Sequence, residues 1–369
     1  MKQHTPKHTP AKAVDLFCGA GGFSLAARNL GIEVVAALEN NHYAAATYRH
    51  NFIEGSRRPP LLFEGDILAI SPEAFMQAAN LTPGGVDIIM GGPPCQGFST
   101  HRIKGAGIDD PRNTLLLRYF EYVQAIRPRY FLVENVPGLL WPRHEEYLQR
   151  FYKLATEAGY HVSPPQVLNA RDYGVPQNRK RVFILGTAGG HTLPDWPPRP
   201  THFAPESSQV RAEGLPAWCT AAQVFATELA NDDPNAIHLN HRPEMVEVFR
   251  STPLNGGSRQ QSCRVLPCHR NHNGHKDVYG RINPDAPGPT MTTACTNPSK
   301  GRFLHPTQHH GITVRHAARF QTFPETFTFK GGIMAASAQV GNAVPIDLGM
   351  AVIRPLLSAL PACIARQSQ

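Results

Sequence analysis

Short apolar segments alternate with helix-like segments along the first half of the chain, and this alternation constrains the fold more than any other feature. The apolar runs are AVDLF, EVVAALE, VDIIM, YFLVENV and RVFILGT, and amphipathic segments such as GFSLAARNL and TLLLRYFEYVQAI lie between them. Strands that are apolar along their whole length are typical of parallel sheets covered by helices on both faces. From residue 12 to about 187 the pattern therefore predicts an α/β fold with a Rossmann-like, doubly wound, mostly parallel sheet.

The alternation stops at about residue 188, where the proline-rich stretch GGHTLPDWPPRPTHFAPESS begins. We expect a second, smaller and loop-rich domain over residues 188–339, inserted between the two parts of the first domain, residues 1–187 and 340–369. The apolar segment IDLGMAVIRPLLSAL has helical spacing. It should pack back onto the first domain, because an amphipathic helix needs a core to cover its apolar face.

The charge of the chain is compatible with a polyanionic partner but does not require one. Lysine and arginine exceed aspartate and glutamate by 36 to 28 in the 369 residues, and 18 histidines add further potential positive charge. A nucleic-acid-binding protein and a merely basic enzyme both fit this balance. The seven cysteines are scattered, unlike a disulfide framework, and neither end of the chain reads as a membrane span. We therefore expect reduced thiols and no membrane partner.

Glycines and acids follow the first three predicted strands. Gly19, Gly21 and Gly22 lie between the first strand and the next helix, where glycine permits a tight turn and close approach of a ligand. Packing of the turn alone would also explain them. Glu39 closes the second strand and Asp66 follows the third, as expected for carboxylates that bind ribose hydroxyls. Together they predict a nucleoside site, and the glycine spacing departs from that of dinucleotide-binding folds.

A cysteine, an acid and two arginines follow the later strands. Cys95, in GGPPCQGFS, lies at the end of the fourth strand, where it is either a nucleophile or a buried, inert thiol. Glu134, in ENVPG, follows the fifth strand and should share the same edge of the sheet. Arg179 and Arg181, in QNRKR, are two residues apart and should share a face in an extended segment. They could hold a phosphate, a carbonyl oxygen or Glu134.

These motifs, in this order, resemble those of the DNA (cytosine-5)-methyltransferase family, in its bacterial form. The matching segments are DLFCGAGGFS, Glu39, GDI, GGPPCQGFS, ENVPG, QNRKR, TVRHAARFQTFP and GNAVP, which leave residues of about 188–280 unmatched. One position departs from the family pattern, since His316 stands where the family normally has glutamate. This difference concerns the packing of one helix.

The resemblance implies methyl transfer from S-adenosylmethionine to carbon 5 of a flipped-out cytosine in a specific duplex DNA sequence, with release of S-adenosylhomocysteine and no metal. It implies a Cys95 nucleophile that adds to carbon 6, a Glu134 that contacts the base, and catalytic arginines at Arg179 and Arg181. The cofactor residues implied are Phe17, Gly19, Gly21, Gly22, Glu39, Asp66, Ile67, Pro94 and Asn342.

The resemblance also places DNA contacts in two parts of the chain. The residues that we expect to bind DNA are Gln96, Ser99, Arg102, Lys104, Arg259, Arg264, Arg270 and Arg281. Residues 99–113 should act as a lid over DNA, and residues 188–339 should recognise the target. Cys263, Cys268 and three nearby histidines fit no common zinc module, so we expect no metal there.

The remaining expectations concern the setting of the enzyme. We expect a monomer in the bacterial cytoplasm or nucleoid that modifies DNA within a restriction-modification system, with any endonuclease on a separate chain. Three alternatives are an RNA cytosine-5 methyltransferase, a catalytically silent DNA-binding regulator and a nicotinamide dehydrogenase. The glycine spacing disfavours the dehydrogenase. The set of Cys95, Glu134 and the two arginines disfavours the silent regulator.

Overall fold

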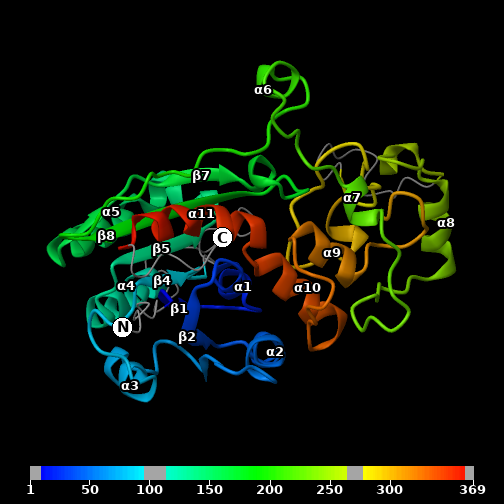
Figure 1. Cartoon of the computed structure of the whole chain (residues 1–369). Helices are drawn as coiled ribbons and strands as arrows, with labels where there is room; N and C mark the ends of the chain where they lie inside the picture. The colour runs from blue at the N-terminus through cyan, green and yellow to red at the C-terminus, as the bar shows by residue number, and fades with distance from the viewer. Residues whose placement is uncertain (1–9, 95–113, 264–276, 362–369) are drawn as a thin grey trace, which may run out of the picture.

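The central sheet has eight strands in a doubly wound order. The computed structural model describes residues 10–94, 114–263 and 277–361. Its strands are β1 (Lys12–Leu16), β2 (Glu33–Glu39), β3 (Leu61–Glu64), β4 (Ile88–Gly91), β5 (Tyr130–Asn135), β6 (Tyr160–Val162), β7 (Gln166–Asn169) and β8 (Lys180–Ala188). They lie in the order β3-β2-β1-β4-β5-β8-β6, and β7 also pairs with β8 (Figure 1). The chain extends from β1 first to one side and then to the other, which confirms the predicted fold class.

The direction of the strands changes at one end of the sheet. Strands β1 to β5 pair in parallel, whereas β8 runs antiparallel to β5, and β6 and β7 run antiparallel to β8. Only residues 170–179 join β7 to β8, which is too short for the crossover that parallel strands need. Because β8 is reversed, its beginning lies at the edge where β5 ends. Pro164 and Pro165 interrupt the outer strand between β6 and β7, as prolines do on edge strands.

Helices cover both faces of the sheet. One layer contains α3 (Pro72–Ala78), α4 (Thr114–Ile126) and α5 (Glu145–Glu157), and the other contains α1 (Gly22–Asn29), α2 (His42–Tyr48) and α11 (Ile346–Ala359). Helix α10 (Gly332–Asn342) packs between α2 and α9 (Val314–Phe320). Strand residues alternate between the two layers: Phe131 and Val133 pack against α4 and α5, while Tyr130 and Leu132 face the other side. This period of two is expected of strands buried on both faces.

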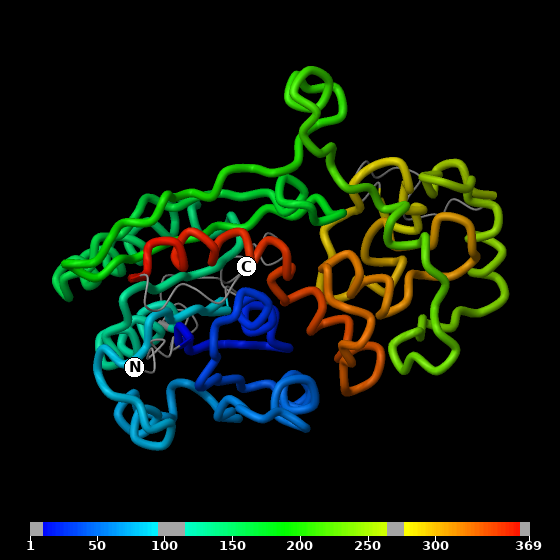
Figure 2. The backbone as a smooth tube through the Cα atoms, viewed as in Figure 1, coloured from blue at the N-terminus to red at the C-terminus, as the bar shows by residue number. Residues whose placement is uncertain are grey.

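The sheet and the helices that cover it form the first lobe of the protein. The last helix returns to this lobe, as its amphipathic pattern predicts. Figure 2 shows the chain leaving the first lobe, forming the second and coming back through α10 to α11. Helix α11 packs on α1, where Gly349 approaches Ala26 closely. The segment Gly332–Ala359 has the length and composition of a membrane span, but 67% of its most apolar stretch is buried inside the protein. Packing in the core therefore accounts for its apolar character.

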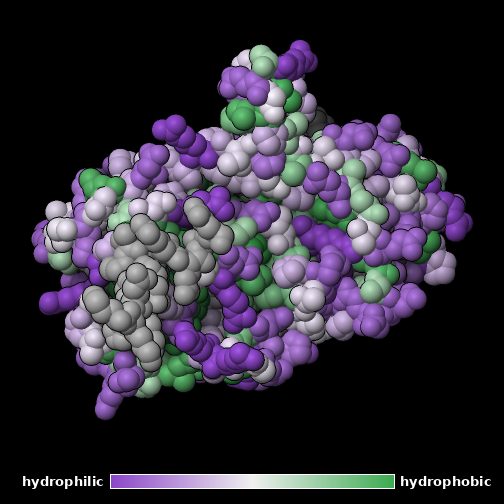
Figure 3. All heavy atoms as spheres, in the orientation of Figure 1, coloured by the Kyte–Doolittle hydropathy of each residue, from purple (hydrophilic) through white to green (hydrophobic). Residues whose placement is uncertain are grey.

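The second lobe, residues 189–331, consists mostly of loops. Its helices are α6 (Ser208–Arg211), α7 (Ala222–Phe225), α8 (Pro243–Ser251) and α9 (Val314–Phe320). In the described part of residues 189–331, β-pairing is limited to single bridges, such as Phe203 with Ala217 and Arg281 with Leu304. The segment that carries α6 stands out from the surface in Figure 3, with hydrophilic and hydrophobic residues side by side. Leu215 at its base is 39% exposed.

A buried arginine takes the place of regular hydrogen bonding at the centre of this lobe. Arg281 is 0% exposed and donates to the backbone oxygens of Phe249, Thr252, His305 and Gln308. Irregular backbone leaves carbonyl oxygens without partners, and the five N–H groups of a guanidinium can satisfy several of them. From the sequence alone, Arg281 was predicted to be a DNA-binding residue. In the structure the N–H groups of its guanidinium donate hydrogen bonds within the lobe, so Arg281 has the position of a structural residue.

The departure from the family pattern at His316 has a clear structural role. Thr313 caps the N-terminus of α9 by accepting from the backbone N–H of His316, and the Nδ1 atom of His316 accepts from the N–H of Thr313. Glutamate or glutamine usually fills this second position of a capping box. The imidazole must be neutral at Nδ1 to accept this bond. Burial, aided by nearby His305 and Arg319, lowers the pKa of His316 to about 3.

Candidate active site

The glycine turn after β1 has a distinct requirement at each glycine. A Cβ atom at Gly21 would lie 2.3 Å from the Phe52 ring, and one at Gly22 would lie 2.6 Å from the backbone oxygen of Val344. Packing therefore explains both. Gly19 has a left-handed φ of 56° and open space where a side chain would be, and Phe17 before it also has a positive φ of 58°. The turn is thus closed on its protein side and open at Gly19, as a ligand-binding turn must be.

Glu39 connects this turn to the next helix. Its Oε2 accepts from the backbone N–H of Gly19 at 2.8 Å, and its Oε1 accepts from that of Asn41 at 2.7 Å. Burial raises the pKa of Glu39, although these donors oppose the shift. A carboxylate has about four acceptor positions, so the group can still accept from ligand hydroxyls.

The other predicted cofactor residues lie around the same edge of the sheet. Asp66 is exposed just beyond β3, which pairs with β2 so that Glu64 lies opposite Glu39. The Asp66 carboxylate accepts from the N–H of Leu68 at 3.0 Å. Ile67 is buried, and Pro94 and Asn342 are exposed. The close approach of Val344 to Gly22 brings the end of α10 to the glycine turn. Open space, acceptors and exposed polar groups at this edge fit S-adenosylmethionine.

Glu134 and Arg181 form a buried ion pair at this edge. Glu134 lies near the end of β5 and Arg181 near the beginning of the reversed strand β8, which brings their side chains together. The Nε atom of Arg181 lies 2.9 Å from Oε1 of Glu134, and the two side chains are 13% and 11% exposed. Burial raises the pKa of Glu134, and the positive charges of Arg181 and Arg179 oppose the shift.

The segment that leads to Cys95 is held against the end of β5. A Cβ atom at Gly92 would lie 3.1 Å from Oε2 of Glu134, so glycine allows this close approach. The side-chain amide of Asn135 donates to the backbone oxygen of Pro93 at 3.2 Å. Asn135 thereby joins the two segments that the sequence analysis placed at one edge. Pro94 is the last described residue before Cys95.

Arg179 has different partners from Arg181, although the sequence suggested that the two share one face. It is 1% exposed and donates to the backbone oxygens of Met291, Gly341 and Ala343 at 2.8, 2.8 and 3.0 Å. Its Nε atom has no partner among the described residues. Arg179 precedes β8, so strand alternation does not apply to it. Its contacts join the second lobe and the end of α10 to the beginning of β8.

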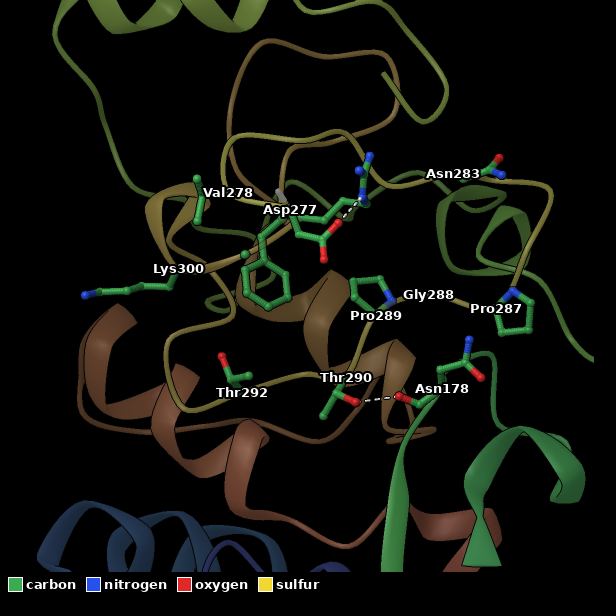
Figure 4. Close-up of a pocket in the computed structure, with 13 residues that line it drawn as sticks. Asn178, Asp277, Val278, Asn283, Pro287, Gly288, Pro289, Thr290, Thr292 and Lys300 are labelled. Carbon is green, nitrogen blue, oxygen red and sulfur yellow. Dashed lines mark hydrogen bonds and ion pairs between the residues drawn. The ribbon is translucent and has the colours of Figure 1, made fainter. Parts of the chain in front are cut away.

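A pocket in the second lobe borders the loop that carries Arg179. Its volume is about 430 Å³, and Asn178, Thr290, Thr292 and Lys300 are among its lining residues (Figure 4). The hydroxyl of Thr290 donates to the backbone oxygen of Asn178 at 2.5 Å. Of the predicted DNA-binding residues that the structure describes, Arg259 and Arg281, neither lines this pocket. The pocket was not predicted from the sequence, although the basic, hydrogen-bonding segment TNPSKGR was a signal for it.

A buried polar group behind the glycine turn was also not predicted from the sequence. Ser24 donates to the Asp15 carboxylate at 2.6 Å, and its oxygen lies 2.9 Å from the Tyr48 hydroxyl. Burial raises the pKa of Asp15 to about 7. An acid inside the otherwise apolar strand AVDLF was the available signal. The hydrogen bonds join β1, α1 and α2 beneath the turn.

Several predicted site residues lie outside the described residues. They are Cys95, Gln96, Ser99, Arg102, Lys104, Arg264 and Arg270. The proposed lid, residues 99–113, also lies there, as do Cys268 and the histidines near it. Arg259 is described and is 7% exposed, and Cys263 is exposed. In residues 10–94, 114–263 and 277–361, no cluster of three or more histidines, cysteines or acids is suited to hold a metal ion.

Comparison with known proteins identifies the family. The family model for C-5 cytosine-specific DNA methylases matches residues 11–358. The Type II methyltransferase M1.HphI of Haemophilus parahaemolyticus is 31% identical over an alignment that covers 93% of this chain and 86% of that protein. The Type II methyltransferase M.AgeI of Thalassovita gelatinovora is 28% identical, with 95% and 100% covered.

Solved structures show the same fold. A protein described as a DNA modification methyltransferase encoded within a prophage (E. coli) superposes with a TM-score of 0.70 at 22% identity, covering 95% of this chain and 99% of that one. Spodoptera frugiperda DNMT2 superposes with a TM-score of 0.62 at 18% identity, covering 94% and 99%. The chain thus belongs to the C-5 cytosine-specific DNA methylase family and is an S-adenosylmethionine-dependent DNA (cytosine-5)-methyltransferase.

Proposed function

We propose that the edge formed by the ends of β1 to β5 and the beginning of β8 is the active site, with Cys95 as the nucleophile and Glu134 as the group that contacts the base. The buried ion pair between Glu134 and Arg181 carries this proposal, because the Nε atom of Arg181 holds Oε1 of Glu134 while Oε2 lies close to Gly92, in the segment that leads to Cys95. A charged pair held beside a reactive segment is typical of catalytic sites.

Each residue then has a defined task. The Cys95 thiolate adds to carbon 6 of cytosine, while Glu134 gives a proton from Oε2 to ring N3, so that carbon 5 gains the electron density of an enamine. Its raised pKa helps Glu134 to hold that proton. Arg181 keeps Oε1 in place. When bound, S-adenosylmethionine supplies an electrophilic methyl group for carbon 5. A base or a water molecule then removes the carbon 5 proton, the thiolate is eliminated and ring N3 returns its proton to Glu134, which restores Cys95, Glu134 and the aromatic ring.

The cofactor is proposed to bind at the glycine turn. Gly19 offers open space, and Glu39 and Asp66 present carboxylates for the ribose and the adenine. Phe17, Gly21, Gly22, Ile67, Pro94 and Asn342 complete the proposed cofactor set. Arg179 holds the two lobes and the end of α10 together next to this site, which we propose as its contribution to catalysis.

Residues 1–187 and 340–369 form the proposed catalytic domain, and residues 188–339 the proposed target-recognition domain. A cytosine inside a duplex is out of reach of a thiol in a cleft, so the base is flipped out, as is general for enzymes that modify bases. Gln96, Ser99, Arg102, Lys104, Arg259, Arg264 and Arg270 remain proposed DNA contacts. We add Lys300 to them, because it lines the pocket of the second lobe and a lysine suits a phosphate.

The setting is proposed from the bacterial relatives, which are named as Type II methyltransferases. This enzyme would protect DNA against a separately encoded endonuclease, as a monomer in the bacterial cytoplasm and without a metal. Duplex DNA is the proposed substrate, with RNA as the alternative that the experiment must separate.

The test is methyl transfer from labelled S-adenosylmethionine to duplex DNA and to transfer RNA, followed by mapping of 5-methylcytosine. Wild-type enzyme should label DNA at one sequence. Cys95→Ala should abolish labelling while DNA binding persists, and Glu134→Gln should lower kcat by roughly 100-fold, as loss of a general acid does. Labelling by Cys95→Ala would refute the covalent mechanism. Labelling of transfer RNA alone would show that RNA, and not duplex DNA, is the substrate.

A further inference from the structure

Arg118 in α4 holds the loop between β3 and α3. Its Nε donates to the backbone oxygen of Ile67 at 3.0 Å, and a terminal nitrogen donates to that of Ile70 at 2.7 Å. The hydroxyl of Tyr122 donates to the same oxygen of Ile70 at 2.6 Å, and the guanidinium lies over the Tyr122 ring, 5.5 Å from its centre. The Arg118 side chain is 17% exposed, so these bonds are largely sheltered from water.

The loop that Arg118 holds is the one that carries two proposed cofactor residues. Asp66 follows β3 with an exposed carboxylate, and Ile67 next to it is buried. Among the described residues, Arg118 supplies the hydrogen bond to the Ile67 oxygen. Within the loop, the backbone N–H of Ala69 donates to the Asp66 oxygen, whereas the Ile67 and Ile70 oxygens accept from side chains of α4. The position of Asp66 beside the cofactor site therefore depends on α4.

We propose that Arg118 is a positioning residue for the cofactor: it fixes the loop that presents Asp66 and Ile67 to the adenosine part of S-adenosylmethionine. This inference rests on the proposed cofactor site. A loop that is ordered before the ligand arrives loses less conformational freedom on binding, which strengthens the affinity. Arg118 also pairs with Glu121 in the same helix, and its two bonds to the loop go to backbone atoms, so it acts through the loop and needs no contact with the cofactor.

The test compares Arg118→Met with Arg118→Lys and Arg150→Met. Methionine keeps an unbranched stem over Tyr122 but donates no hydrogen bond, whereas lysine can restore one. Arg150 is an exposed arginine of α5 and serves as the matched control. Calorimetry without DNA gives Kd for S-adenosylmethionine and for S-adenosylhomocysteine. Steady-state methylation gives KM and kcat, and thermal unfolding reports the fold.

Loss of charge-assisted bonds to the loop should raise both Kd values and KM for S-adenosylmethionine roughly tenfold in Arg118→Met. The binding of both ligands should weaken equally, because they share the adenosine. The kcat should change by less than about twofold, since the transition-state contacts remain. Arg118→Lys should lie between Arg118→Met and the wild type. Arg150→Met should match the wild type.

An unchanged Kd in a folded Arg118→Met protein would overturn the inference, and so would a fall in kcat at constant KM. Glu39→Gln and Asp66→Asn separate this failure from that of the proposed cofactor site. If they weaken cofactor binding and Arg118→Met does not, only the role of Arg118 is wrong. If neither weakens it, the cofactor site itself is wrong and the inference falls with it.

Discussion

Removal of Arg181 tests the central feature of the site, the buried ion pair with Glu134. In Arg181→Met the carboxylate of Glu134 would stay buried without its partner, 2.9 Å away in the wild type. Breaking a buried pair from one side typically costs 3–5 kcal/mol. Both side chains retain some exposure, 13% and 11%, so we expect the lower end, about 3 kcal/mol at pH 8. For a lobe of about 200 residues this corresponds to a fall in Tm of roughly 6–12 °C.

The pH dependence of this loss has a defined sign. Burial raises the pKa of Glu134 in the folded state, so its ionisation costs stability as the pH rises through that pKa. Arg181 opposes the shift, and its removal should raise the pKa further. The deficit of Arg181→Met relative to the wild type should therefore be small in acid, where Glu134 is protonated, and should grow toward pH 8.

The assay is calorimetric unfolding of four proteins at pH 5.5 and pH 8. They are the wild type, Arg181→Met, Arg181→Met with Glu134→Gln, and Arg199→Met. The double variant has no buried charge and should recover much of the lost Tm. Arg199 pairs with Asp195 at 3.9 Å with both side chains more than 80% exposed, so its loss should leave Tm unchanged. Equal Tm values for Arg181→Met and Arg199→Met, or no recovery in the double variant, would refute the reasoning.

Three further predictions follow from the fold. Burial lowers the pKa of His305 to about 4 and of His316 to about 3, so the unfolded chain binds protons first and stability should fall as the pH drops from about 6.5 to 4. Thermal unfolding should show less of this loss in His316→Gln, which keeps a capping acceptor. Gly22→Ala should reduce the yield of folded protein, because its Cβ would lie 2.6 Å from the Val344 oxygen, whereas Gly19→Ala, with open space, should cost about 1–2 kcal/mol for its left-handed φ. Arg281→Met should lower Tm while the salt dependence of DNA binding by the folded fraction stays unchanged; a shallower salt slope would instead return Arg281 to the DNA interface.

Local pattern was sufficient for the core of the fold and for placing the residues that follow its parallel strands at one edge of the sheet. Continuous apolar strands that alternate with amphipathic helices are typical of a mostly parallel sheet covered on both faces, so the layers could be predicted from the sequence. The carboxyl ends of parallel strands meet at one edge, so Glu39, Asp66 and Glu134 could be assigned to it. The role of His316 could not be predicted from local pattern, because only the capping box in the structure explains how a histidine can replace the glutamate of the family at this position.

The sequence by itself determined which residues gather at the edge, because strand ends and motif order are local properties. Only the tertiary structure decided which of two neighbouring arginines meets the acid. Arg181 pairs with Glu134 because β8 runs antiparallel beside β5. Arg179 instead donates hydrogen bonds to the backbone oxygens of Met291, Gly341 and Ala343. Likewise the sequence predicts that Arg281 binds DNA, yet its hydrogen-bond partners come from segments up to 32 residues away in the chain. Burial and hydrogen-bond partners depend on how distant segments pack, which spacing along the chain does not specify.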